Sequence, residues 1–121
     1  MKFAIGLLFA AVANAAHSIL DYGNVTQGLN PTEEEEKENS AAFVRAIQAA
    51  NASSDDRVMT IPKGVVFSMF PVRVGGMEDV TFDINGHVLA TKRWLSWPID
   101  GHTYETLFQV DNSRKLTFQS S

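Results

Sequence analysis

Carboxylates gather at two places in the sequence where acid–base or metal chemistry has to be considered. Glu33 to Glu36 form one acidic run with Glu38, and Asp55-Asp56 form a second, shorter one. A calcium site needs oxygens that converge from a folded loop, whereas consecutive glutamates diverge around a helix. We interpret the glutamate run as a solvated helix start, with a cation site as the alternative, and Asp55-Asp56 as turn residues between a helix and a strand.

The three histidines are the other side chains suited to proton transfer, and they are far apart in the sequence. His17 precedes the first apolar pair of the chain. His87 alternates with apolar residues on an expected strand, which favours a position that faces solvent or a turn. His102 lies in a stretch rich in polar and aromatic residues. No catalytic, cofactor-binding or metal-binding residue is predicted from these positions.

That aromatic stretch is the best candidate for a binding surface. Its members are Trp94, Trp97, His102 and Tyr104. Tyrosine and tryptophan combine a flat apolar ring with a polar group, and exposed rings of this kind can stack on sugars. The stretch is therefore the candidate carbohydrate contact. The alternative is that the two tryptophans cover the side of the fold.

Composition restricts the class of protein. The chain has 121 residues, of which 45% are hydrophobic and 20% charged, and it contains eight phenylalanines, as a globular domain requires. The formal net charge of −4 provides no basic surface for nucleic acid or for an anionic membrane. The absence of cysteine excludes disulfides and thiolate metal sites. No cofactor is expected.

The first residues have the pattern of a secretory leader. Met1-Lys2 is followed by 11 apolar residues from Phe3 to Ala13, and Ala13-Asn14-Ala15 supplies the small residues that signal peptidase recognises. The run is shorter than the ~20 residues that cross a bilayer. Residues 1–15 are therefore predicted to be a signal peptide of a secreted protein, with a buried N-terminal helix as the alternative. Asn24 and Asn51 begin possible N-glycosylation sequons.

A helix is predicted in the middle of the chain. Its apolar face recurs at helical spacing and comprises Ala42, Phe43, Ala46, Ile47, Ala49 and Ala50. Thr32 and Glu35 have the spacing of a capping box, which would place the acidic run in the first turn. Alternatively, Asn39 or Ser40 caps the helix and the acidic run is loop. The helix is expected to end near Asn51.

Short strands are predicted after this helix, with no further helix between them. The expected segments are Val58–Ile61, Val65–Phe67, Pro71–Val74, Val80–Ile84, His87–Ala90, Phe108–Val110 and Leu116–Phe118. Asn85-Gly86 by itself indicates a tight antiparallel hairpin.

A repeat with a period of 36 residues points to a different arrangement. Val72-Arg73-Val74 and Val80-Thr81-Phe82 recur as Phe108-Gln109-Val110 and Leu116-Thr117-Phe118. Such repetition without helices is typical of a parallel β-helix, in which each coil stacks on the last. Because ordinary coils are shorter, an insert is expected at Thr91–Thr106. A small antiparallel sandwich is the alternative fold.

An ordered set of motifs resembles one known family. Asp21-Tyr22-Gly23 followed by Ser40–Ala50 resembles the opening of pectin-lyase-like β-helix proteins, and Val58–Phe67 resembles their V-x-I-P-x-G-x-F segment. Pro71–Thr91 and Asn112–Phe118 resemble the next two segments, in the same order. The set covers nearly all of the chain after the leader. Its pattern is most similar to polygalacturonases and related hydrolases of glycoside hydrolase family 28.

The resemblance implies a fold and a function. It implies a right-handed parallel β-helix with an N-terminal capping helix, and residues 16–121 are expected to be the cap and opening coils of a domain that continues beyond them. Members of the family hydrolyse glycosidic bonds with inversion, using aspartates in Asn-Thr-Asp and Asp-Asp motifs that precede Gly-His-Gly and Arg-Ile-Lys. The sequence has no counterpart of these catalytic aspartates. Asp55-Asp56 is an Asp-Asp pair, but it precedes the first coil.

The chain is therefore expected to be the N-terminal part of a secreted, polygalacturonase-like enzyme, inactive by itself. Its expected partners are a pectin-type polysaccharide in the whole enzyme and other copies of the chain through an open last coil, and neither nucleic acid nor membrane is expected. One alternative is a non-catalytic β-helix protein that binds carbohydrate or a surface. Another is a short secreted protein with an unrelated role.

Overall fold

A computed structural model describes residues 16–101 and 103–121 of the chain. The predicted leader and the candidate contact His102 lie outside the described residues. The elements in chain order are β2 (His17–Ser18), η1 (Ile19–Asp21), α2 (Glu33–Ala52), β3 (Val58–Ile61), β4 (Val66–Met69), β5 (Val72–Gly75), β6 (Thr81–Ile84), β7 (His87–Ala90), η2 (Trp94–Ser96), β8 (Ile99–Asp100), β9 (Thr103–Tyr104), β10 (Phe108–Asp111) and β11 (Thr117–Gln119).

The helix α2 begins at the first of its two predicted starts. The Thr32 hydroxyl accepts from the backbone N–H of Glu35 at 3.1 Å, and the Glu35 carboxylate accepts from the N–H of Thr32 at 2.8 Å. This reciprocal capping box satisfies two of the N–H groups that a helix start leaves unpaired. Asn39 and Ser40, the alternative caps, therefore lie inside the helix.

The strands form parallel sheets that the chain visits in a fixed order. It passes through β3, β4 and β5, then through β6, β7 and β10, and each strand of the second pass pairs in parallel with its counterpart of the first. The strand β11 then adds to β6, which gives a four-stranded sheet in the order β11-β6-β3-β2. The fold is mainly β with one α-helix. Parallel pairing rules out the antiparallel sandwich for these strands.

The predicted 36-residue repeat is confirmed in the strand register. Phe108 lies opposite Val72 in the β10–β5 pair, and Thr117 lies opposite Thr81 in the β11–β6 pair. The turns before β6 and β11 also correspond, because Asp79 and Lys115 both have left-handed backbones, with φ of 57° and 56°. The Asp79 N–H donates to the carbonyl of Arg114 at 3.1 Å, so these two turns are directly stacked.

The hairpin interpretation of Asn85-Gly86 is wrong. The strands that this turn joins, β6 and β7, belong to different sheets, and each pairs in parallel with a strand of the preceding pass. This turn stacks on the turn that joins β3 to β4, because the N–H groups of Asn85 and Gly86 both donate to the Ile61 carbonyl. The approach is so close that a Cβ on Gly86 would lie 2.3 Å from the Val65 carbonyl oxygen.

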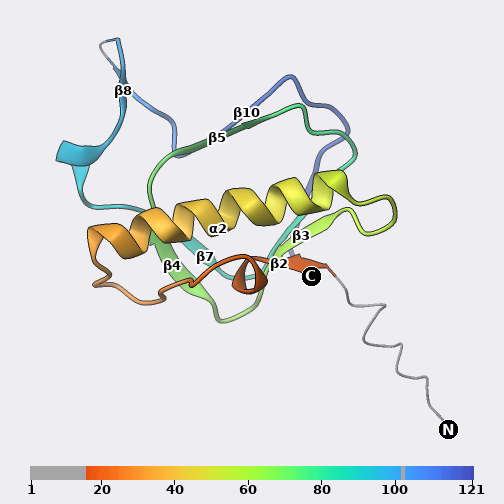
Figure 1. The fold of residues 1–121 in the computed structure, drawn as a ribbon, viewed down its shortest axis with the longest axis horizontal. Coiled ribbons are helices and arrows are strands. Elements are labelled where there is room, and N and C mark those ends of the chain that lie inside the picture. The colour runs from red at the N-terminus through yellow and green to blue at the C-terminus, as the bar shows by residue number, and fades with distance from the viewer. Residues whose placement is uncertain (1–15, 102) are drawn as a thin grey trace, which may run out of the picture.

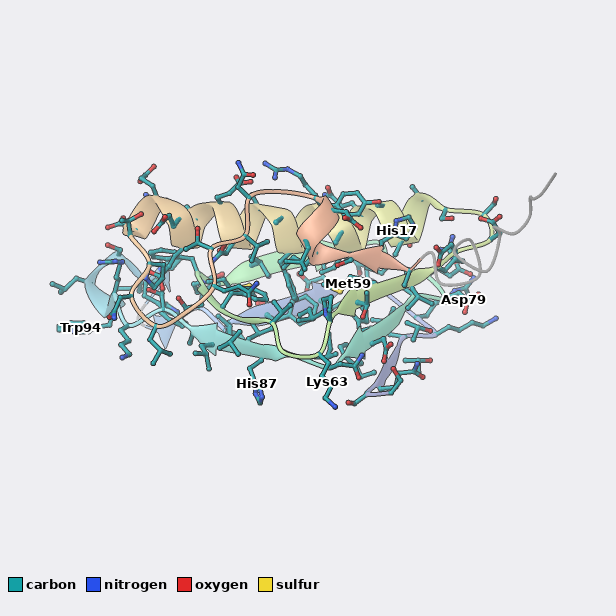
Figure 2. The ribbon with its side chains drawn as sticks, turned by 90° about the horizontal axis from the view of Figure 1, so that it is seen from below. His17, Met59, Lys63, Asp79, His87 and Trp94 are labelled. Carbon is teal, nitrogen blue, oxygen red and sulfur yellow. The ribbon has the colours of Figure 1, made fainter. Side chains whose placement is uncertain are left out.

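The helix α2 lies along one side of the stacked strands. Figure 2 shows it above the four-stranded sheet, with β2 next to the helix and β3, β6 and β11 successively farther from it. Its buried face meets the interior of the sheets, where Phe43 packs edge-on against Phe108 with ring centroids 5.2 Å apart. Phe82 continues the aromatic contacts, edge-on to Phe108 and stacked on Phe118.

The insert expected at Thr91–Thr106 is also observed. Two residues separate β4 from β5, whereas 17 separate the corresponding strands β7 and β10. The extra length contains η2 and the small antiparallel pair β8–β9, and it projects from the body of the molecule (Figure 1). Within residues 16–101 and 103–121, no helix has the length and apolar character needed to cross a bilayer.

Candidate functional site

A cavity of about 450 Å³ lies where the insert leaves the strands. It is bounded by the loop before α2, the first turn of α2, the ends of β4 and β7, and the first residues of the insert. The lining residues are Gly28, Leu29, Asn30, Pro31, Glu36, Ser68, Leu89, Ala90, Lys92 and Arg93. Both apolar side chains and a buried charge therefore face the same space.

Glu36 is the centre of the polar wall of this cavity. Its Oε2 accepts from the Ser68 hydroxyl at 2.5 Å, and its Oε1 accepts from the Thr91 hydroxyl at 2.7 Å and from Arg93 Nε at 2.9 Å. Arg93 also donates through Nη2 to the Pro31 carbonyl at 2.7 Å. Three segments distant in the sequence, α2, β4 and the start of the insert, are thus joined at one carboxylate.

The electrostatics of Glu36 follow from this arrangement. Burial by itself raises the pKa of a carboxyl group, because it penalises the charged form. The hydrogen bonds from Ser68, Thr91 and Arg93, together with the positive charge of Arg93, outweigh burial and lower the pKa of Glu36 below its ordinary value of 4.5. Glu36 is therefore ionised at neutral pH and holds the base of the insert.

Asn39 fixes the neighbouring wall one turn along α2. Its Oδ1 accepts from the Thr26 N–H at 2.8 Å, and its Nδ2 donates to the carbonyls of Thr26 and Ser68 at 3.0 and 2.9 Å. The side chain is fully buried and fully hydrogen-bonded. It ties the loop before α2 and the strand β4 to the helix, which keeps the cavity walls in place.

A second hollow, of about 290 Å³, adjoins the cavity on the outer side of the insert. Lys92 and Arg93 line both spaces, and Trp94, Leu95, Ser96 and Glu33 complete the second one. The Trp94 side chain is 62% exposed and lies at one end of the molecule (Figure 2). An exposed indole beside a lysine offers both a flat apolar face and a cation to a ligand.

Of the four predicted carbohydrate contacts, the two tryptophans differ in exposure. Trp94 faces a hollow, whereas Trp97 is half-buried and donates through Nε1 to the Glu105 carbonyl at 2.8 Å, which braces the insert. Tyr104 lies on β9, opposite Ile99. The sequence placed both tryptophans in one class, but the structure gives them different roles.

The two sequons differ in accessibility. Asn24 is exposed on the loop before α2. Asn51 is held at the end of α2, where its Oδ1 accepts from the Glu78 N–H at 3.0 Å and from Arg57 at 3.3 Å, and its Nδ2 donates to the Gly76 carbonyl. Asn51 thus connects the helix to the turn before β6, and Asn24 is the better placed of the two for a glycan.

The other candidate residues occupy the predicted kinds of position. Asp55-Asp56 forms the turn between α2 and β3, where the Ser53 hydroxyl accepts from the Asp56 N–H at 3.0 Å. His87 is exposed on β7 and points away from the body of the molecule (Figure 2). Among the residues that the structure describes, no three histidine or acidic side chains are grouped to hold a metal ion.

The role of Glu36 was missed because the acidic run was treated as equivalent throughout. One signal could have found it. Glu36 lies seven residues before Phe43, so it falls on the same helical face as the apolar stripe. A charged residue on a buried face needs a partner, and Arg93 is the partner.

Comparisons with known proteins add no relative to this description. A scan against models of protein families found no match, and searches of curated proteins and of solved structures found none similar to this chain.

Proposed function

We propose that this chain forms the helical cap and first turns of a secreted parallel β-helix protein of the polygalacturonase-like type. One observation carries the proposal: the chain visits three sheets twice in the same order, and each strand pairs in parallel with its counterpart. That path is expected of a solenoid whose coils stack on one another. Right-handed winding is expected because parallel crossover connections are almost always right-handed.

The placement of α2 supports a capping role. A solenoid needs a terminal unit whose outer face is polar. The helix contacts β3, β4 and β5, which form the first turn of the stack, and β2, which pairs with β3. Its outward face carries Glu34, Lys37, Arg45 and Gln48, all exposed. The helix therefore covers one end of the interior with a face suited to water.

Polysaccharide binding is the role that we propose for this part of the protein. Inverting hydrolysis needs a protonated carboxylic acid and a carboxylate base that flank one glycosidic bond. Glu36 is unsuited to the acid role, since its lowered pKa keeps it ionised and Arg93 already pairs with it. We therefore assign the cleavage of a pectin-type polymer to coils that follow in the whole enzyme, as the resemblance implies.

A non-catalytic polysaccharide-binding protein is the second candidate. The hollow beside Trp94 favours it, because it offers a binding surface that does not depend on any catalytic group. The reading frame after Ser121 separates the two candidates. An in-frame continuation with Asn-Thr-Asp and Asp-Asp strings supports the hydrolase, whereas coils without those aspartates support the binding protein.

The binding role can be tested by affinity electrophoresis of the secreted chain in gels that contain polygalacturonate. We expect the polymer to retard the chain, and we expect Trp94→Ala to weaken binding several-fold, because tryptophan is enriched among the minority of contact residues whose truncation costs more than about 1 kcal/mol. Leu20→Ala is the matched control, since Leu20 is also an exposed apolar residue and lines neither the cavity nor the hollow.

Two results would count against this proposal. Equal retardation of the Trp94→Ala and wild-type chains would remove Trp94 from the binding surface, and no retardation by any polysaccharide would refute the binding role. Reducing-sugar release from polygalacturonate by the purified 121-residue chain would refute the assignment of catalysis to other coils.

A further inference from the structure

Asp56 carries a polar atom that the described residues leave unsatisfied. Its Oδ2 is buried and has no hydrogen-bond partner, the only such atom among the side chains that the structure describes. A buried carboxylate oxygen without a partner costs free energy. The position therefore points to a missing donor or cation.

Arg57 and His17, the basic side chains beside Asp56, have other partners. Arg57 directs its guanidinium to the carbonyls of Ser53, Glu78 and Asp79 and to the amide of Asn51. The His17 ring contacts the backbone of Asp56 instead of its carboxylate: because a carbonyl only accepts, Nε2 donates to the Asp56 oxygen at 2.9 Å. The other ring nitrogen, Nδ1, is 2.6 Å from the Tyr22 hydroxyl.

The first described residues of the chain lie beside this carboxylate. The strand β2 pairs with β3 so that His17 lies opposite Met59, which places Ala16 level with Val58, two residues after Asp56. Neighbouring strands are about 4.8 Å apart and each residue advances about 3.3 Å. These spacings put the Cα atoms of Ala16 and Asp56 about 8 Å apart, a gap that the Asp56 side chain and a small shift of Ala16 would close.

We propose that removal of the leader creates the missing partner: the new α-ammonium group of Ala16 pairs with the Asp56 carboxylate. A signal peptidase would hydrolyse the Ala15–Ala16 peptide bond, with water supplying the hydroxyl of the Ala15 carboxylate and a proton of the Ala16 amine. Before cleavage the Ala16 nitrogen is an uncharged amide, and afterwards it is a cation near neutral pH. The inference rests on the secretory leader of the proposed function.

This pairing would couple maturation to folding. The strand β2 has only two residues, and a terminal charge held at Asp56 would anchor it to the turn between α2 and β3. A charge pair that is partly removed from water is screened less than one on the surface. The mature chain should therefore keep β2 docked more firmly than a chain that retains its leader.

The test uses the full chain expressed with its leader and collected after secretion. N-terminal sequencing should give Ala16 as the first residue. The pKa of the α-amino group, measured from the pH dependence of its acylation rate, should lie about one unit above the ordinary ~7.7–8.0, because a nearby carboxylate stabilises the ammonium. Asp56→Asn should restore the ordinary value. Asp55→Asn, which removes the exposed neighbouring carboxylate, should leave the raised value in place.

Three outcomes overturn the inference: a mature chain that begins at another residue, an α-amino pKa in the ordinary range, or an equal fall in Asp56→Asn and Asp55→Asn. The wild-type titration decides the question even if the Asp56→Asn chain does not fold. Failure here is distinct from failure of the proposed function, since polysaccharide retardation depends on Trp94 and involves neither Ala16 nor Asp56.

Discussion

Single residues in this protein connect segments that are distant along the chain. The hydrogen-bond donors to Glu36 are Ser68, Thr91 and Arg93, which lie 32 to 57 residues later. Local sequence gives no information about such partners, and this explains why the acidic run was interpreted as uniformly solvated. That interpretation holds for Glu34, whose side chain is 86% exposed, and it is wrong for Glu36.

Replacement of Glu36 should destabilise the fold. Glu36→Gln keeps the shape of the side chain but leaves Arg93 without its counter-ion and weakens the hydrogen bonds from Ser68 and Thr91. We expect a loss of about 2 kcal/mol in the free energy of unfolding, at the low end for charged hydrogen bonds because the Arg93 side chain is 39% exposed. Urea denaturation measures this loss.

The stability of the Glu36→Gln variant should depend less on acidic pH than the stability of the wild type. The pKa of Glu36 is lower in the folded chain than its ordinary value of 4.5, so ionised Glu36 stabilises the fold above about pH 4.5. That contribution disappears as the pH falls through the lowered value, and Glu36→Gln should show a smaller loss between neutral and acidic pH. Glu34→Gln, at the exposed position, should behave as wild type within about 0.5 kcal/mol. Equal effects of both variants would contradict the role of Glu36.

At the scale of elements, the sequence predicted the strands better than their connections. Alternation of apolar residues identified Val58–Ile61 and His87–Ala90 with the bounds that β3 and β7 have. The Asn85-Gly86 pair was misleading because its turn preference is local, whereas the pairing of β6 and β7 depends on strands of the preceding turn. The 36-residue repeat corrected this, since it compares distant segments and thereby carries information about stacking.

The sequence likewise predicted some features of the candidate site and not others. The sequence located the insert and its exposed tryptophan, because a change in composition and an interrupted repeat are both visible in one dimension. It could not separate Trp94 from Trp97, since the difference lies in a hydrogen bond to the Glu105 carbonyl. It also could not predict the cavity, whose walls come from five segments that meet only after the strands have stacked.

The stacking of the turns can be tested at Gly86. An alanine there would place its Cβ 2.3 Å from the Val65 carbonyl and 2.7 Å from that of Pro62, so the turn between β6 and β7 would have to move off the turn beneath it. We expect Gly86→Ala to lower the free energy of unfolding by about 3 kcal/mol, near the upper end for overpacked sites. Thermal unfolding followed by circular dichroism measures the loss.

A second glycine provides the control. Gly75 ends β5, and a Cβ there would meet its nearest atom, the Asp111 carbonyl oxygen, at 3.4 Å, an ordinary contact distance. Gly75→Ala should therefore change stability by less than about 1 kcal/mol. Similar unfolding curves for Gly86→Ala and wild type would show that the two turns are not in contact in solution.

At the scale of the whole molecule, the two ends of the stack differ. The helix α2 covers the end that carries the first turn, with a polar outer face. At the other end all residues of β11 are exposed, and Phe118 is 59% exposed while its ring stacks on Phe82 at 4.6 Å. An apolar hollow of about 220 Å³ opens between Phe118 and Phe43. An aromatic surface beside an unpaired strand edge is suited to pairing with another strand.

This asymmetry predicts that the chain associates with itself through β11. Sedimentation velocity over a range of concentrations should show a species larger than the monomer that grows with concentration. Phe118→Lys should shift the distribution toward the monomer, because it places a charge on the exposed apolar surface and charged residues at sheet edges oppose pairing.

Leu95→Lys is the matched control, since it introduces the same charge at an exposed apolar residue of the insert, away from β11. If Leu95→Lys dissociates the assembly as fully as Phe118→Lys, association depends on general hydrophobicity and not on the strand edge. A wild-type chain that stays monomeric at every concentration would show that the exposed edge of β11 does not pair with other copies.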